Sequence, residues 1–275
     1  MTTTGPAPTL APVPQARPKS TLRAVGLPVE HGGWSLTLEP VILGLLVAWS
    51  RAGVALGAVA MVAFMARTPL KVVLVDRWRH RWLDRTRVAA RLLAVELGVL
   101  VVLAGVAALN TDARFWVPLA VAAPLVGVEL WFDMRSRSRR LVPELAGTIG
   151  IGSMAAAIAL AGGVGAAVAV GLWSVVAARS VAAMPYVRTQ LLRGRHKPHR
   201  LWHSDLAQVL AVTTVTVSWV AGGLPFAPVV AMAVIAAINL TAVRLRPRPA
   251  VVIGVQQTVF GIAVIAVTAV SVLVA

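Results

Sequence analysis

Long apolar runs separated by short polar stretches are the dominant pattern of the chain. Nine runs lie at about residues 34–50, 53–70, 90–109, 115–132, 142–162, 164–185, 206–222, 225–243 and 250–274. Each holds about 17–25 residues, which as an α-helix is enough to cross a hydrocarbon core of roughly 30 Å. The pattern therefore predicts an all-α fold, a polytopic membrane bundle of about nine transmembrane helices.

The composition supports one membrane unit, because 58% of the 275 residues are hydrophobic and the runs leave little chain for a soluble domain. We predict a disordered cytoplasmic tail over residues 1–28, rich in Pro, Thr and Ala, which lacks the apolar core of a signal peptide. Residues 29–275 then form a single transmembrane domain. The chain has no cysteine, which excludes disulfides, thiolate metal ligands and cysteine nucleophiles.

Basic residues alternate from one connection to the next. Of the 26 Lys and Arg residues, all but Arg51 and Arg114 lie in the tail, in the second, fourth, sixth and eighth connections, or in the spans beside them. Lys and Arg are retained on the cytoplasmic side of a membrane. We therefore expect a multi-pass plasma-membrane protein with its N-terminus inside and its C-terminus outside. Topology and anionic lipid account for the net charge of +16, so no nucleic-acid partner is expected.

Length and charge concentrate in two connections, residues 71–89 and 186–205, both on the predicted cytoplasmic side. The connections on the other side, such as 161–165 and 222–225, are short and nearly uncharged. This asymmetry places any chemistry at the cytoplasmic face and weakens the case for a plain scaffold.

A carboxylate stands inside the first run. Glu39 follows His31 and Ser35 at i, i+4, i+8 spacing, so the three share one face if the helix begins near His31. A charge at that depth normally faces a bundle interior or a polar cavity. We interpret His31 and Glu39 as candidate proton-transfer groups, and a locking pair between Glu39 and a basic residue is the structural alternative.

Cations stand within or at the end of several other runs. Arg67 and Lys71, one turn apart, could face one anion near a kink or break at Pro69, although snorkelling explains Lys71 equally well. Glu129, Arg179, Tyr186 and Arg188 complete the candidate substrate-binding set. The polar groups Asn239, Gln256 and Gln257 are more simply explained by interhelical hydrogen bonds.

Two aspartates follow the second run. Asp76 is a candidate catalytic residue and, with Asp84, a candidate pair of Mg²⁺ ligands, since Mg²⁺ takes a few oxygens together with substrate phosphates. Six arginines lie close by in the sequence, and ion pairing with them is the simpler alternative.

Several of these motifs resemble the YwiC-like family of bacterial integral membrane proteins. The resemblance is carried by Glu30-His31-Gly32-Gly33-Trp34 with Glu39-Pro40, by Arg67-x-Pro69-Leu70 with Asp76-Arg77, by Arg139-Arg140 with Pro143-Glu144, and by Tyr186-Val187-Arg188. It implies a multi-pass bacterial membrane protein and no particular reaction.

A fainter resemblance is to the UbiA-type membrane prenyltransferases, which have nine spans and active loops after spans two and six. Arg85-Thr86-Arg87 is similar to their RTR sequence, and 132–140 to their Tyr/Lys-Arg stretch. Those enzymes hold Mg²⁺ and a prenyl diphosphate with two aspartate-rich motifs. Here the first motif is thinned to Asp76 and Asp84, so the resemblance implies a diphosphate held mainly by Arg and Lys.

Three functional hypotheses follow. The first is a UbiA-like cavity that binds or transforms an isoprenoid phosphate or another amphiphilic anion, with the head group near Arg67, Lys71, Arg179 and Arg188. The second is an anion or proton-coupled transporter that uses the same residues. The third is a non-catalytic membrane partner of another complex. Convergence of the ionisable groups on one cavity would favour the first, and dispersal into separate helix contacts would favour structural pairing.

Overall fold

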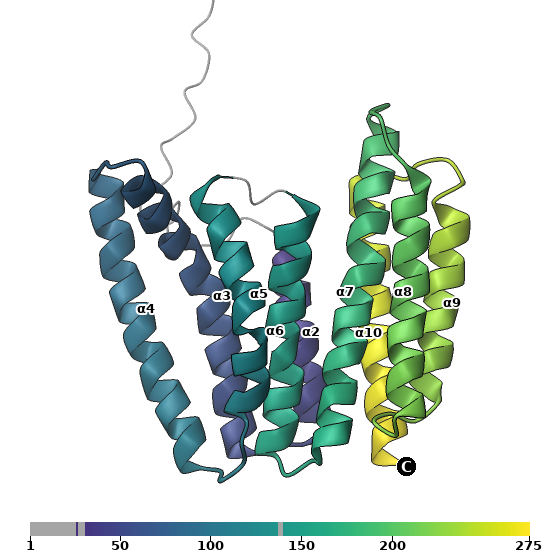
Figure 1. The fold of residues 1–275 in the computed structure, drawn as a ribbon, viewed down its shortest axis with the longest axis horizontal. Helices are drawn as coiled ribbons and strands as arrows, with labels where there is room; N and C mark the ends of the chain where they lie inside the picture. The colour runs from purple at the N-terminus through teal and green to yellow at the C-terminus, as the bar shows by residue number, and fades with distance from the viewer. Residues whose placement is uncertain (1–25, 27–30, 137–139) are drawn as a thin grey trace, which may run out of the picture.

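The computed structural model describes residue 26, residues 31–136 and residues 140–275 (Figure 1). The predicted tail over residues 1–28 lies outside the described residues except for Gly26, and the side chain of His31 also lies outside them. Nine helices follow one another through the described residues: α2 (His31–Val47), α3 (Arg51–Trp78), α4 (Asp84–Leu109), α5 (Trp116–Met134), α6 (Leu141–Ala161), α7 (Ala166–Gly194), α8 (Leu201–Val220), α9 (Ala227–Ala242) and α10 (Ala250–Leu273).

The predicted all-α bundle is confirmed, because each of the nine apolar runs coincides with one helix. Six described helices are long and apolar enough to cross a membrane: α3, α4, α5, α6, α7 and α10. The apolar helices α2 and α9 are shorter, at 17 and 16 residues. Helix α8 is less apolar because its first turns contain His203, Asp205 and Gln208.

Two helices are longer than the apolar runs predicted. The structure corrects the expectation of loops over 71–89 and 186–205, because α3 continues to Trp78 and α7 to Gly194. Pro69 lies inside α3 and does not end it. With 28 and 29 residues at about 1.5 Å each, the two helices reach about 42 and 43 Å. They therefore extend about two turns beyond a hydrocarbon core of roughly 30 Å.

The bundle is organised around α2, α6 and α7. Helix α2 packs on α3, α6, α7 and α10, whereas α4 lies at one edge and packs mainly on α3 (Figure 1). Small residues let the central helices approach closely: a Cβ on Gly44 would collide with Ile158 of α6, and a Cβ on Gly162 with Ala48. Leu43 and Leu172 fill the core between them.

Three helices end in the same kind of turn. The second residue after α3, α5 and α7 is His80, Ser136 and His196, and each has a positive φ of 51–55°. This left-handed conformation ends a helix most easily with glycine, because a side chain costs energy there. The turns after α3 and α5 lie beside the pocket described below.

Candidate functional site

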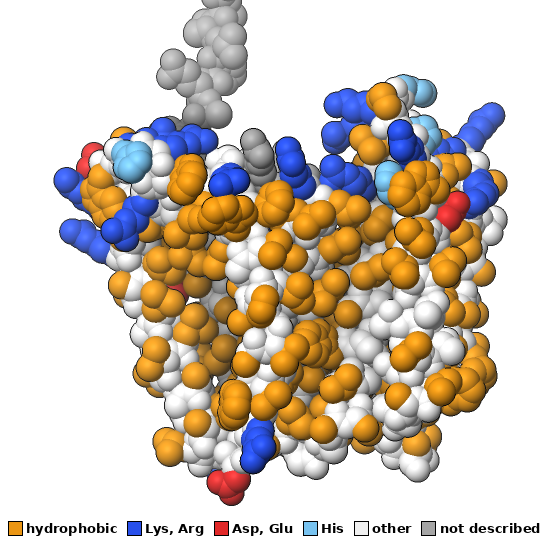
Figure 2. Space-filling model, in the orientation of Figure 1, with side chains coloured by type: hydrophobic (Ala, Val, Ile, Leu, Met, Phe, Trp, Pro, Cys, Tyr) orange, Lys and Arg blue, Asp and Glu red, His pale blue; other side chains and the backbone are white. Residues whose placement is uncertain are grey.

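Basic side chains gather at one end of the bundle (Figure 2). The α3–α4, α5–α6, α7–α8 and α9–α10 connections meet there, while the opposite end holds Arg51, Asp112 and Arg114. Arg244 donates two hydrogen bonds to Asp205 at this basic end, at 3.0 and 2.8 Å, and these bonds raise the pKa of Arg244. The alternation of charge along the sequence thus becomes a basic end and a nearly uncharged end.

Two cations of α3 face two carboxylates of α5. Arg67 Nη2 lies 2.8 Å from Glu129 Oε1, and its Nε donates to Asp133 Oδ2 at 3.3 Å. Lys71 Nζ lies 3.3 Å from Asp133 Oδ1. Both pairs have i, i+4 spacing, which places each pair on one helix face. We call these four residues the α3–α5 charge network, in which two positive and two negative charges balance.

Helix α6 completes the surroundings of this network. A Cβ on Gly147 would collide with the Glu129 carboxylate, so the glycine makes room for it. One turn earlier on α6, Glu144 Oε2 lies 3.9 Å from Arg188 Nη1 of α7. The structure thus brings Arg67, Lys71 and Glu129 together, and it pairs Arg188 with Glu144 between α6 and α7.

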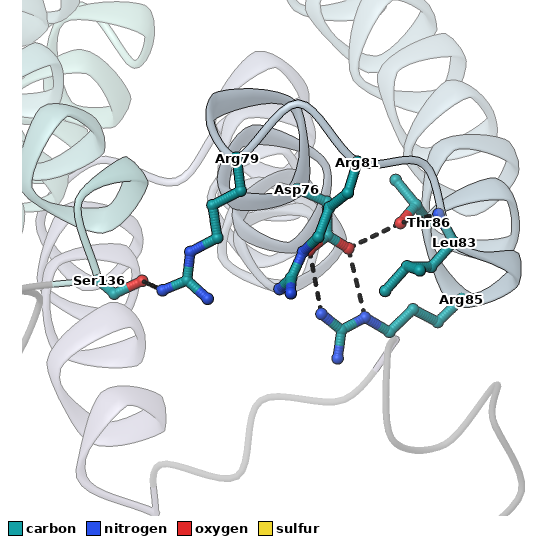
Figure 3. Close-up of polar contacts among 7 residues, drawn as sticks. All are labelled: Asp76, Arg79, Arg81, Leu83, Arg85, Thr86 and Ser136. Carbon is teal, nitrogen blue, oxygen red and sulfur yellow. Dashed lines mark hydrogen bonds and ion pairs between the residues drawn. The ribbon is translucent and has the colours of Figure 1, made fainter.

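Asp76 lies at the last turn of α3 and is fully buried (Figure 3). Its Oδ1 accepts hydrogen bonds from Arg81 Nε at 2.8 Å and Arg85 Nη2 at 3.0 Å. Its Oδ2 accepts from Thr86 Oγ1 at 2.7 Å and Arg85 Nε at 3.3 Å. Thr86 also accepts from the Leu83 main-chain N–H. Asp76 therefore fastens the end of α3 to the start of α4.

The second aspartate of the predicted Mg²⁺ pair lies apart from Asp76. The side chain of Asp84 is fully exposed, and its Oδ1 lies 3.6 Å from Arg87 Nη1. The described residues contain no group of three or more His, Asp or Glu side chains that could hold a metal ion. With both Asp76 oxygens engaged by protein donors, this arrangement does not fit Mg²⁺. Binding of Mg²⁺ itself stays an untested prediction.

A pocket opens between the ends of α3 and α5. It has a volume of about 440 Å³ and is lined by Trp78, Arg79, Met134, Arg135 and Ser136. Arg79 Nη2 donates to Ser136 Oγ at 3.0 Å across it (Figure 3). The pocket is therefore bounded by two guanidinium groups, a hydroxyl and an indole, all exposed at the basic end.

Aromatic rings fix one of these guanidinium groups. The Arg135 Cζ lies 4.1 Å from the centroid of Trp131 and 5.7 Å from that of Trp78. The two indoles meet edge to face with centroids 6.4 Å apart. Trp at the end of a membrane helix anchors it at the headgroup level, and stacking on its rings pre-orders the arginine. Sequence reasoning missed Arg79 and Arg135, because nothing in the spacing singled them out from the other basic residues.

The two most deeply placed ionisable candidates lie on other helices. Arg179 of α7 and Glu39 of α2 are both buried, and Arg179 Nη2 lies 4.0 Å from Glu39 Oε1. The same nitrogen donates to the main-chain oxygen of Gln257 in α10. Helix α2 begins at His31, which is the condition for Ser35 and Glu39 to share a face with it, but the side chain of His31 is outside the described residues.

Tyr186 is fully buried and its hydroxyl accepts a hydrogen bond from Gln190 Nε2 at 3.3 Å. It therefore packs between α7 and its neighbours and does not line the pocket. The expected interhelical role of Asn239 and Gln257 is confirmed: Asn239 Nδ2 donates to Gln208 Oε1 at 3.2 Å, and Gln257 Nε2 donates to Asn239 Oδ1 at 3.3 Å.

One buried carboxylate escaped the sequence analysis. Glu96 lies in the middle of α4, is 8% exposed, and its Oε2 has no hydrogen-bond partner among the described residues. A carboxylate inside an apolar run was itself a usable signal. Its place on the edge helix α4 separates it from the charge network and from the pocket.

Comparisons with known proteins match one family. Residues 27–159, a little under half of the chain, match the family described as YwiC-like protein. The matched part covers α2 to most of α6 and contains the α3–α5 charge network, Asp76 and the pocket. No curated protein and no solved structure matches the chain significantly, so the UbiA resemblance gains no support from them. With its apolar helices, the chain is a multi-pass membrane protein whose residues 27–159 match the YwiC-like family.

Proposed function

We propose that this protein binds the phosphate head group of an amphiphilic anion, such as an isoprenoid phosphate, at its basic end. That end faces the cytoplasm of a plasma membrane, because Lys and Arg side chains gather on it (Figure 2). The observation that carries the proposal is the pocket between the ends of α3 and α5, where Arg79 and Arg135 stand beside an interfacial tryptophan pair.

The pocket offers the groups that a phosphate needs. Guanidinium groups donate paired hydrogen bonds that match phosphate oxygens in geometry and charge. Ser136 accepts a hydrogen bond from Arg79, so its own hydroxyl proton remains available for a phosphate oxygen. Trp78 and Met134 supply an apolar wall for the first carbons of the lipid tail.

A lipid tail has a path away from the pocket along α5. Val121, Val128 and Trp131 are all substantially exposed and lie at i, i+7 and i+10, on one face of the helix. The tail of an amphiphile could lie along this face in the hydrocarbon region, while its head group stays at the level of Trp78.

The charge network has a supporting part in this proposal. Arg67 and Lys71 face Glu129 and Asp133, so an anion would have to compete with two carboxylates for them. These residues hold α3 against α5 and thereby position the two helix ends that form the pocket. Asp76 is engaged by Arg81, Arg85 and Thr86, so the proposal is one of binding and assigns no bond-making step.

The binding test compares farnesyl phosphate with farnesol on the purified full chain in detergent. We expect the phosphate to bind and the alcohol to bind far more weakly. The variant R79Q/R135Q should weaken farnesyl phosphate binding by at least about 10–100-fold, since even one lost hydrogen bond to a charged group costs about 1.5–3 kcal/mol. R246Q removes an exposed charge from the α9–α10 connection at the same end and is the matched control. Equal binding of the alcohol, or an equal effect of R246Q, would refute the proposal.

Orientation is tested separately, and the absence of native cysteine makes the test clean. Cysteine is introduced at His199, at the basic end, or at Asp112, at the opposite end. On intact cells, a membrane-impermeant thiol reagent should label D112C and should label H199C only after the membrane is opened. The reverse pattern would place the pocket outside and contradict the proposed orientation.

A further inference from the structure

Arg179 uses few of its hydrogen-bond donors within the bundle. Its side chain is 4% exposed, and a guanidinium carries five N–H groups. One nitrogen, Nη2, donates to the main-chain oxygen of Gln257, while Nε and Nη1 have no acceptor among the described residues. Leaving such donors unpaired in a membrane interior is costly. The site therefore has donors for an acceptor that the described residues do not supply.

Glu39 is close to Arg179 but not bonded to it. The 4.0 Å between Arg179 Nη2 and Glu39 Oε1 is an ion-pair distance that is too long for a hydrogen bond. A Cβ on Gly261 of α10 would collide with the Glu39 carboxylate, so the glycine keeps the space that the carboxylate occupies. Gln257 adds an Oε1 atom without a donor among the described residues. The Arg179 guanidinium, the Glu39 carboxylate and the Gln257 main-chain oxygen thus meet between α2, α7 and α10.

Charge balance restricts what this region can bind. Glu39 and Arg179 together are neutral, so adding an anion alone would leave one buried negative charge, and adding a proton alone one positive charge. Each uncompensated charge in a low-dielectric interior costs several kcal/mol. An anion and a proton that bind together keep the site neutral: the proton forms an O–H bond on Glu39, and the anion pairs with Arg179.

We infer that Glu39, Arg179 and Gln257 form an intramembrane site that binds a small monovalent anion together with one proton. Among the described residues, Arg179 is the only charged side chain within ion-pair distance of Glu39. From α10, the neutral groups Gly261 and Gln257 face the pair.

Several charged groups on the other helices packed on α2 pair away from Glu39. On α3, Arg67 and Lys71 pair with the carboxylates of α5, and Asp76 is bound by Arg81 and Arg85. On α6, Glu144 pairs with Arg188. Protonation of Glu39 is therefore coupled to the charge of Arg179 and to the anion beside it.

The test uses methanesulfonate, a monovalent oxyanion that stays ionised, with the full chain in detergent. Isothermal titration calorimetry in buffers of different ionisation enthalpy counts the protons taken up. We expect about one proton per anion, and a dissociation constant that rises about tenfold per pH unit once Glu39 is ionised. E39Q should still bind the anion, with no proton uptake and no pH dependence.

E39Q/R179Q supplies the second arm and leaves no buried charge, so its folding is preserved, as size-exclusion chromatography verifies. This variant should not bind methanesulfonate. Binding by the double variant, proton uptake by E39Q, or the absence of methanesulfonate binding by the native chain would each overturn the inference. None of these results bears on farnesyl phosphate binding, which is tested through Arg79 and Arg135.

Discussion

Replacing Asp76 with Asn is expected to loosen the turn between α3 and α4. The substitution keeps one oxygen for Arg81 and Arg85 but puts an amide N–H₂ where Oδ2 now accepts from Thr86 and Arg85. Hydrogen bonds to a charged group contribute about 1.5–3 kcal/mol each. Arg81 and Arg85 are 39% and 49% exposed, so solvent screens part of the gain. We expect a net loss of about 2–3 kcal/mol in the free energy of unfolding.

The assay is equilibrium unfolding in mixed detergent micelles, followed by helical circular dichroism. D84N is the matched control, because it removes a carboxylate of the same connection whose side chain is fully exposed. We expect D84N to unfold with the native chain. Asp76 and Asp84 are the predicted Mg²⁺ ligands, so the comparison also distinguishes a structural role of Asp76 from a metal-binding role.

Two results would refute this reasoning. If D76N unfolds with the native chain, the four hydrogen bonds at Asp76 do not stabilise the turn. If Mg²⁺ stabilises the native chain and both D76N and D84N abolish that effect equally, the two carboxylates act together on a metal in spite of their separation here.

Three smaller predictions concern packing, a turn and a buried amide, and each is checked in the same unfolding assay. G147A should be destabilising because its Cβ would displace the Glu129 carboxylate, whereas G98A, which faces open space, should gain about 0.5–1 kcal/mol; equal effects would contradict the glycine's proposed part. H196G should gain about 1 kcal/mol by relieving a φ of 52°, and a loss would show that the side chain matters more. N239A should cost about 1–2 kcal/mol because two glutamines lose their partner, and no change would assign those bonds no net stability.

The helices could be predicted from the sequence, but their ends could not. Apolar runs reveal the part of a helix that must avoid water, and all nine runs are helices. Helices α3 and α7 continue past their runs because Arg, Trp and Gln side chains are equally compatible with a helix above the membrane. The alternative of a helix break at Pro69 was wrong, since a helix packed against neighbours in a membrane tolerates the lost hydrogen bond.

The sequence showed which ionisable residues lie within the membrane spans, but it did not show which residues they pair with. Spacing within one helix correctly grouped Arg67 with Lys71 on one face. Which carboxylate each cation meets depends on how α3 and α5, or α7 and α2, are rotated about their axes. A single sequence contains no measure of that rotation. The sequence analysis therefore considered one shared cavity, whereas the structure places the ionisable groups in several clusters on different helix pairs.

The two proposed anion sites should respond differently to salt. Each carboxylate of the α3–α5 charge network faces a cation, and so do Asp76 and Glu39. The surplus positive charge behind the net charge of +16 therefore lies mainly on the exposed connections of the basic end. The electric field of these exposed charges acts through solvent and falls off over a Debye length of about 8–10 Å at physiological salt. Raising salt from about 0.1 to 1 M, which shortens this length to about 3 Å, should therefore weaken farnesyl phosphate binding at the pocket. Methanesulfonate binding should persist when the added salt is the sulfate of a large cation. Arg179 is buried and thus shielded from the salt, and sulfate does not compete for the site because one proton cannot balance its two negative charges. Equal weakening at both sites would mean that the buried pair is open to the solvent field, and the argument from charge balance would then fail.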